Sequence, residues 1–180
     1  MSETALSILV FLHLIFIAVW VGSQILVAAA VMPSLRRITG GEDRLAALEY
    51  FTRRFNHVAW GSMILIVITG GLMVSERIDQ VRAIFGDSIL DARWGWIFVI
   101  KMTLWVLMLG AVAAHSFLVG PRQLELNRQA LEQDDSWAAQ HLRPLQRRSI
   151  MLSVGGLVLS LLVLGSGAFL ANHLYSFQAA

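Results

Sequence analysis

Four long apolar stretches, separated by segments rich in arginine, make up most of the sequence. They cover about residues 6–32, 57–74, 96–119 and 150–171. A helix needs roughly 20 mostly apolar residues to cross a bilayer, and in lipid its backbone polar groups must be satisfied internally. The pattern therefore predicts an all-α, polytopic membrane protein, a bundle of four transmembrane helices that forms one domain over residues 1–180. We expect Pro33 and the Gly120-Pro121 pair to end the first and third helices.

The connecting segments carry the arginines. Segments 33–56 and 120–149 hold five each, segment 75–95 holds three, and the N-terminal tail holds none. Because basic residues in short loops favour the cytoplasmic side, we expect the first and third connections in the cytoplasm. Both termini and the middle connection then lie outside, in the periplasm. Short surface helices are expected around 123–140 and 79–84.

Composition agrees with a membrane location. The chain is 57% hydrophobic and 14% charged, whereas soluble domains average roughly 25% charged residues, so the lipid bilayer is its expected environment. The net charge of +2 comes from arginines that flank the apolar stretches, which gives no reason to expect nucleic acid as a partner. The absence of cysteine excludes disulfides, thiolate metal sites, iron–sulfur clusters and covalently attached haem.

Ionisable residues within the apolar stretches are the main functional signal. None of the thirteen arginines lies there, but Lys101, the single lysine, does, as do histidines. Such residues are costly in lipid and mark functional sites by default. At about 1.5 Å per residue, we expect His13, Lys101 and His173 in the outer half of the membrane. His57 and His115 are expected in the inner half.

Helical phase, at 100° per residue, predicts which aromatic residues lie beside these groups. Lys101 and Trp105 fall on one stripe of the third helix, together with His115. Trp20 shares a face with the histidine of the first helix, and Trp60 shares one with His57. The stripes are expected to face the bundle interior.

Two histidines at one depth on different helices are what a b-type haem needs, since its iron takes axial imidazoles from opposite faces. We predict an outer haem between His13 and His173 and an inner one between His57 and His115, or a single haem on one of these pairs. Arg53 and Arg54 are placed to pair with propionates, and Lys101 with a propionate, an anion or a quinone oxygen. The residues predicted to hold or contact the cofactor are His13, His57, His115, His173, Lys101, Arg53, Arg54, Trp20, Trp60 and Trp105.

The predicted function is transmembrane electron transfer by this haem. Quinone or another respiratory or periplasmic redox protein would be the partner, which would make the protein a membrane oxidoreductase, and a homo-oligomer is left open. Copper transport or copper resistance is the alternative, because copper accepts imidazole and thioether ligands. His13, Met73 and His173 could then gather near the outer face. A structural accessory subunit with no cofactor is a further alternative.

Several motifs resemble the CopD-like (copper resistance D) family of integral membrane domains. They are HLIFIAVWVG at 13–22, Arg54-Phe55 before a helix that closes with TGGL at 69–72, Trp94-Gly95-Trp96 followed by Lys101, and LQRRS at 145–149. The resemblance covers nearly the whole chain and implies a link to copper passage across the bacterial inner membrane. The chain is also similar, more weakly, to HemJ-type protoporphyrinogen oxidases, which bind b haem and have a histidine late in the third helix, as His115 is here. It lacks their NExP-type entry to the last helix, and a HemJ-like oxidase is the remaining alternative.

Overall fold

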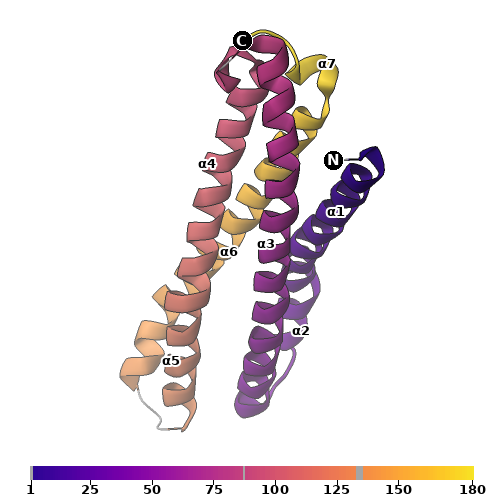
Figure 1. Cartoon of the computed structure of the whole chain (residues 1–180). Coiled ribbons are helices and arrows are strands. Elements are labelled where there is room, and N and C mark those ends of the chain that lie inside the picture. The colour runs from indigo at the N-terminus through magenta and orange to yellow at the C-terminus, as the bar shows by residue number, and fades with distance from the viewer. Residues whose placement is uncertain (1, 87, 133–135) are drawn as a thin grey trace.

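The computed structural model describes residues 2–86, 88–132 and 136–180. Its first long helix runs without a break from Glu3 to Leu35 and consists of α1 (Glu3–Leu26), a π-helical turn η1 (Val27–Val31) and α2 (Met32–Leu35). The second, α3, extends over 45 residues, Gly41–Phe85 (Figure 1). A short 3-10 helix, η2 (Ile89–Asp91), then leads into the second half of the chain.

The third long helix consists of α4 (Arg93–Ala113), a second π-helical turn η3 (Ala114–Val119) and α5 (Gly120–Glu132). The fourth, α6 (Ser136–Ala171), is followed by the short α7 (His173–Ser176). All four long helices are apolar enough to cross a membrane. The described residues form no strand, and the prediction of an all-α bundle of four membrane-spanning helices is confirmed.

The predicted helix ends at Pro33 and Gly120-Pro121 are wrong, because both helices continue through them. Each proline comes two residues after a π-helical turn. In these turns the backbone N–H of Met32 donates to Val27 and that of Gly120 donates to His115, five residues back in each case. An α-helix is interrupted at proline by the missing N–H and by a clash with the carbonyl four residues back. The wider turn changes this register, so the chain passes the proline while remaining helical.

The helices also extend further beyond the apolar stretches than predicted. α3 begins at Gly41 rather than near residue 57, and the surface helix expected at 79–84 is its last part. The surface helix expected at 123–140 is divided between α5 and α6, and residues 133–135 of it lie outside the described residues. Polar segments rich in Ala, Leu, Glu and Arg are good helix formers, so they prolong helices that hydropathy alone marks only across the lipid.

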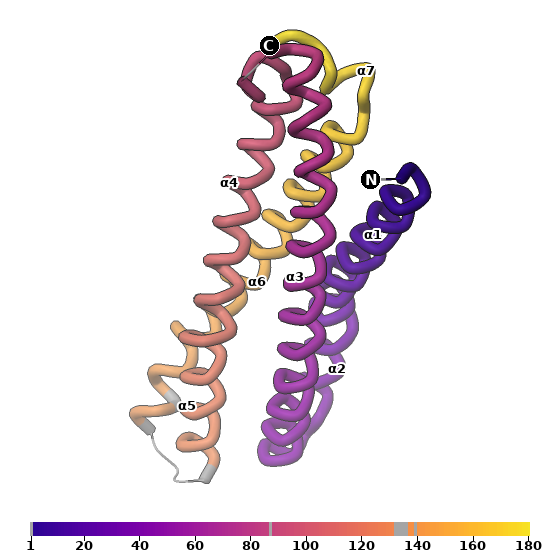
Figure 2. The backbone as a smooth tube through the Cα atoms, in the orientation of Figure 1, coloured from indigo at the N-terminus to yellow at the C-terminus, as the bar shows by residue number. Residues whose placement is uncertain are grey.

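The helices associate as two pairs, α1 with α3 and α4 with α6 (Figure 2). The upper end is closed by a small cluster in which Val81, Ala92 and Trp94 are buried and Phe177 packs against them. The C-terminal tail is bound there by its backbone: Arg93 N–H donates to Gln178 at 3.0 Å, and Ala180 N–H donates to Asp91 at 2.9 Å.

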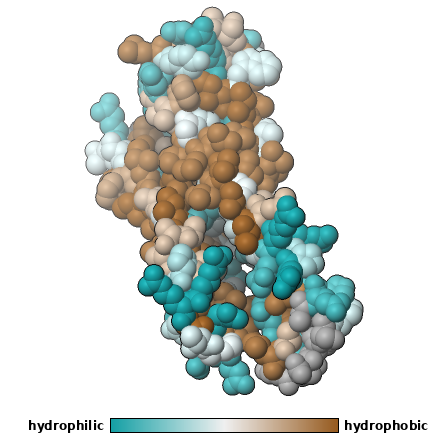
Figure 3. All heavy atoms as spheres, turned by 180° about the vertical axis from the view of Figure 1, so that it is seen from behind, coloured by the Kyte–Doolittle hydropathy of each residue, from teal (hydrophilic) through white to brown (hydrophobic). Residues whose placement is uncertain are grey.

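The surface is that of a protein in lipid. Only 6% to 22% of the residues in the most apolar window of each helix are buried, so most of their side chains face outward. A broad band of apolar residues covers the middle of the face in Figure 3, and polar residues lie at its upper tip and gather toward the lower end. Both termini lie in the upper half of Figure 1, whereas α2 and α5, next to the five-arginine segments, lie at the lower end.

Candidate functional site

His13 of α1 makes the central polar contact of the upper half. Its Nδ1 lies 2.8 Å from Oγ1 of Thr69 on α3, and Thr69 is only 5% exposed. The imidazole lies so close to α3 that a Cβ at Gly70 would be 3.0 Å from His13 Cε1. The glycine is therefore what lets the ring approach this helix.

The hydrogen bonds of Thr69 determine the tautomer of His13. Thr69 Oγ1 lies 2.7 Å from the carbonyl oxygen of Leu65, one turn back in its own helix. A carbonyl can only accept, so the single hydroxyl proton of Thr69 is used there. Oγ1 must then accept from Nδ1–H of His13. In the neutral ring this leaves the lone pair on Nε2, the nitrogen that can bind a metal.

Lys101 of α4 lies next to this histidine. Its Nζ packs on α6 at Gly167, where a Cβ would come within 3.4 Å, and it is close enough to His13 for its charge to act on the imidazole. The sequence prediction that Lys101 and His13 share one half of the bundle holds in this respect. No carboxylate among the described residues forms a hydrogen bond or an ion pair with Lys101 that would neutralise it.

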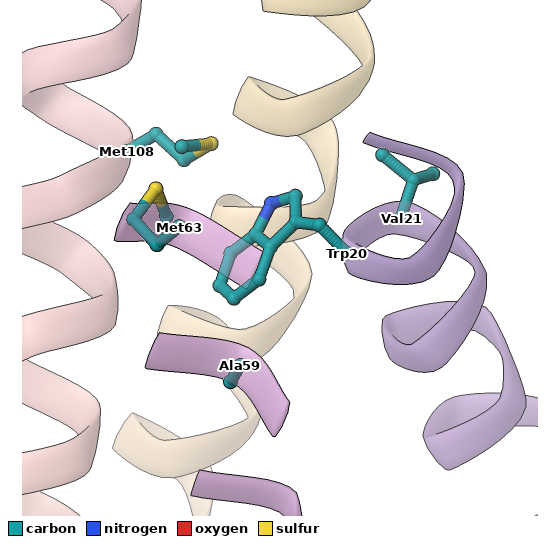
Figure 4. Close-up of a cluster of buried hydrophobic side chains, with 5 residues drawn as sticks. All are labelled: Trp20, Val21, Ala59, Met63 and Met108. Atoms are coloured by element: carbon teal, nitrogen blue, oxygen red, sulfur yellow. The ribbon is translucent and has the colours of Figure 1, made fainter. Parts of the chain in front are cut away.

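A second polar contact holds the bundle together near its centre. Oγ of Ser160 on α6 accepts from Trp20 Nε1 at 3.1 Å and from Gln24 at 3.0 Å, which ties α1 to α6. Figure 4 shows Trp20 together with Met63 of α3 and Met108 of α4, and the three side chains are 2% to 4% exposed. Trp20 is thus a core residue with a satisfied N–H. Trp105 packs against the same cluster from α4.

The lower half contains two buried polar atoms without a partner among the described residues: Nδ1 of His115 and Nε1 of Trp60. His115 lies in the π-helical turn η3, and Trp60 contacts Phe117 of that turn with ring centroids 5.3 Å apart. Buried polar groups are nearly always hydrogen-bonded, so these two atoms are the ones most open to a ligand or to water.

His57 and its neighbouring arginines lie at the lower surface. Nδ1–H of His57 donates to the carbonyl of Arg53 at 2.7 Å, within α3, and the ring is exposed. Arg53 is exposed too, and the Arg54 guanidinium lies 5.6 Å from the ring centroid of Tyr50. The structure does not place His57 in the interior with His115.

His173 begins α7 at the upper end. Its ring stacks on Phe177 with centroids 5.1 Å apart, and it is near enough to Arg77 of α3 to feel that charge. Partial burial, and after it the charge of Arg77, lower the pKa of His173. The imidazole therefore stays neutral, the form that binds metals, to a lower pH than usual.

Neither predicted histidine pair provides the geometry of a bis-histidine haem site. His13 lies at the height of Thr69, whereas His173 stacks on Phe177, which packs with Val81 in the upper cluster. The two histidines therefore lie at different heights of α3. In the lower half, His57 is exposed and bound to its own helix, whereas His115 is half-buried and its Nδ1 is fully buried. The residues do not fit a haem gripped from both faces by either pair.

Soft donors lie at several heights of the bundle. Met63 and Met108 share the central cluster, and Met73 lies one helical turn above Thr69. The described residues contain no group of three His, Cys, Asp or Glu that could hold a metal ion. We call the histidines and methionines at these heights the donor column. From the lower to the upper end this donor column comprises His57, His115, Met63, Met108, His13, Met73 and His173.

Sequence reasoning did not single out Thr69, Met63 or Ser160 as site residues. A threonine or serine in a membrane helix ordinarily bonds its own backbone, so its residue type gives no signal. Met63 is one of seven methionines, most of which are expected in packing. Their roles appear only when α3 and α6 are placed against α1.

The family described as copper resistance protein D (CopD) matches residues 49–170. No curated protein and no solved structure matches the chain. The matched region begins in the lower part of α3 and ends near the end of α6, so it includes Lys101 and His115 but not His13. It covers about two thirds of the 180 residues, and the chain therefore belongs to the CopD family, whose members are multi-pass membrane proteins related to copper resistance.

Proposed function

We propose that the protein passes copper, as Cu(I), through the bundle along the donor column, with His13 as its central ligand. The observation that carries this proposal is the His13–Thr69 hydrogen bond. It fixes the ring against α3 and leaves Nε2 with the lone pair. Metal-binding histidines are typically oriented by such a bond from their other nitrogen.

The chemistry of the donor column suits Cu(I). Imidazole and thioether groups are soft ligands that select this ion, and the column contains no carboxylate or thiolate that would hold a harder or more strongly bound ion. Each donor can be assigned to the α3 residue nearest its height. These residues are 57 for His57, 60 for His115, 63 for Met63 and Met108, 69 for His13, 73 for Met73 and 77 for His173. The longest interval, from 63 to 69, is about 9 Å at 1.5 Å per residue. Flexible methionine side chains can cover such intervals.

The position of Lys101 suits a protein that transports the ion better than one that stores it. A permeating ion must bind well enough to enter and weakly enough to leave. In its protonated form, Lys101 beside His13 opposes a metal cation there and lowers the affinity of that position. It also deters a second cation while the first is bound.

Copper binding by purified protein tests this assignment. In competition with a chromophoric Cu(I) chelator under reducing conditions, His13→Ala should weaken binding at least tenfold. The matched control is His141→Ala, an exposed histidine outside the donor column. Lys101→Gln should tighten binding by about tenfold, which corresponds to about 1.4 kcal/mol. Equal affinities in His13→Ala and wild type would contradict the assignment.

The second candidate is a haem held by His115 alone, which would serve electron transfer to quinone or another redox partner. Its support is the buried Nδ1 of His115, which has no partner among the described residues and lies in a π-helical turn. Such turns are frequent at functional sites.

An absorption spectrum of protein purified without added haem separates the two candidates. A Soret band that disappears in His115→Ala would establish the haem and make copper passage the lesser function. A colourless protein that binds Cu(I) supports the donor column. Consumption of protoporphyrinogen by the haem form would indicate a HemJ-like oxidase instead.

A further inference from the structure

A groove at the lower end of the bundle lies apart from the donor column. It runs between α5 and the first part of α6 and encloses about 260 Å³. Arg122 and Leu126 line it from α5, and the five other lining residues belong to α6. The lining residues are Arg122, Leu126, Trp137, His141, Pro144, Leu145 and Arg148.

The lining is cationic at one end and apolar at its base. Of the described residues that line it, two are arginines and none is a carboxylate. Leu126 is 3% exposed and forms the base. His141 stacks on Trp137 with centroids 4.1 Å apart, and its Nδ1–H donates to the Trp137 carbonyl at 2.8 Å. Guanidinium groups bind phosphate oxygens through paired hydrogen bonds.

The two arginines lie at the membrane boundary. The third apolar stretch ends at about residue 119 and the fourth begins at about residue 150, so Arg122 and Arg148 are each within three residues of lipid. A group bound between them would stand at the height of lipid phosphates. The arginine-rich end is the one we expect in the cytoplasm, where the leaflet carries anionic lipids.

The size of the groove limits what it can take. It is smaller than the roughly 300–1,000 Å³ of sites that enclose a drug-sized ligand. At about 30 Å³ per water, it has room for a phosphate group, part of a glycerol and some water. Leu126, Pro144 and Leu145 supply apolar contacts that a free phosphate would not use.

We propose that this groove binds the headgroup of an anionic phospholipid, with Arg122 and Arg148 on the phosphodiester and Leu126, Pro144 and Leu145 beside the glycerol. The lipid would join α5 to α6 at the point where the helices leave the membrane.

Native mass spectrometry of the full chain, titrated with phosphatidylglycerol, tests this proposal. Arg122→Gln/Arg148→Gln should weaken binding by about tenfold. The control Arg143→Gln/Arg147→Gln removes the same charge from α6 outside the groove and should change it less than twofold. If the double variant does not fold, the single variants give the same comparison.

Two further binding measurements distinguish an anionic phospholipid from a zwitterionic lipid and from free phosphate. Phosphatidylcholine should bind at least tenfold more weakly than phosphatidylglycerol, and inorganic phosphate should not compete with the lipid at equal concentration. If the groove variant and the control variant lose the same affinity for phosphatidylglycerol, the lipid is attracted by the overall positive charge and not bound by the groove. Equal binding of phosphatidylcholine, or full competition by phosphate, would likewise overturn the proposal.

Discussion

One hydroxyl group determines which nitrogen of His13 faces Thr69 and which can bind copper. Thr69→Val keeps the shape of the side chain but removes the acceptor for Nδ1–H. Loss of such an orienting partner typically lowers metal affinity by 10–100-fold. We therefore expect a drop of about that size in the Cu(I) affinity of Thr69→Val, measured by chelator competition.

Thr103→Val is the matched control for this substitution. Thr103 also donates to the carbonyl four residues back, at 2.9 Å, but it is exposed and bonds no histidine. Its replacement should leave the affinity unchanged. If the two valine variants bind copper equally well, the Thr69 hydroxyl does not orient the ligand.

At this scale the sequence pointed to His13 and Lys101 because ionisable groups in an apolar stretch are costly and rare. It could not reveal the neutral partners. Thr69 is one residue among many that satisfy their own helix, and its contact with His13 joins residues 56 positions apart. The ligand roles given to His57, His115 and His173 stay predictions.

Among the helices, the connection between α3 and α4 depends on close packing at Gly95. This residue is buried, and a Cβ there would overlap the backbone carbonyl of Ile89 in η2. Backbone cannot move aside as a flexible side chain can. Gly95→Ala should therefore destabilise the upper cluster around Trp94 by about 1–3 kcal/mol.

Thermal unfolding in detergent measures this effect. Gly110→Ala is the control, since a Cβ at Gly110 meets nothing within 4 Å. Its unfolding temperature should remain the same or rise slightly, because alanine favours a helix over glycine by up to about 1 kcal/mol. Equal unfolding temperatures for the two alanine variants would show that η2 can move away from the added Cβ without a loss of stability.

Helix existence and type were predictable because four apolar stretches of membrane length allow little else. Helix ends were not, as Pro33 and Pro121 show. Proline is a reliable stop only where the helix keeps its α register, and the π-helical turns before both residues leave no simple mark in the sequence. The polar extensions of α3 were missed since hydropathy reports lipid contact rather than helicity.

For the whole molecule, the arrangement of the arginine-rich segments predicts its orientation. The segments with five arginines adjoin the lower end of the bundle (Figure 1), and the positive-inside rule assigns them to the cytoplasm. The chain has no cysteine, so single cysteines can be introduced without background. In intact bacterial cells, an impermeant thiol reagent should label Ser2→Cys and Ser88→Cys but not Thr39→Cys.

Labelling of Thr39→Cys alone would show that the orientation is the reverse of the predicted one. Labelling of Ser2→Cys without Ser88→Cys would show that the chain does not cross the membrane twice between these two residues.

The organisation as one domain over residues 1–180 likewise stays a prediction. It would be supported if heat or denaturant unfolded the protein in a single cooperative transition.

Copper flux into proteoliposomes tests the donor column most directly. Vesicles containing a Cu(I)-specific dye and the purified protein should take up Cu(I) faster than protein-free vesicles. His13→Ala, checked for an unchanged unfolding temperature, should lose at least nine tenths of that flux, while His141→Ala should keep it. Wild-type flux equal to that of empty vesicles, or full flux in His13→Ala, would contradict copper passage through the bundle.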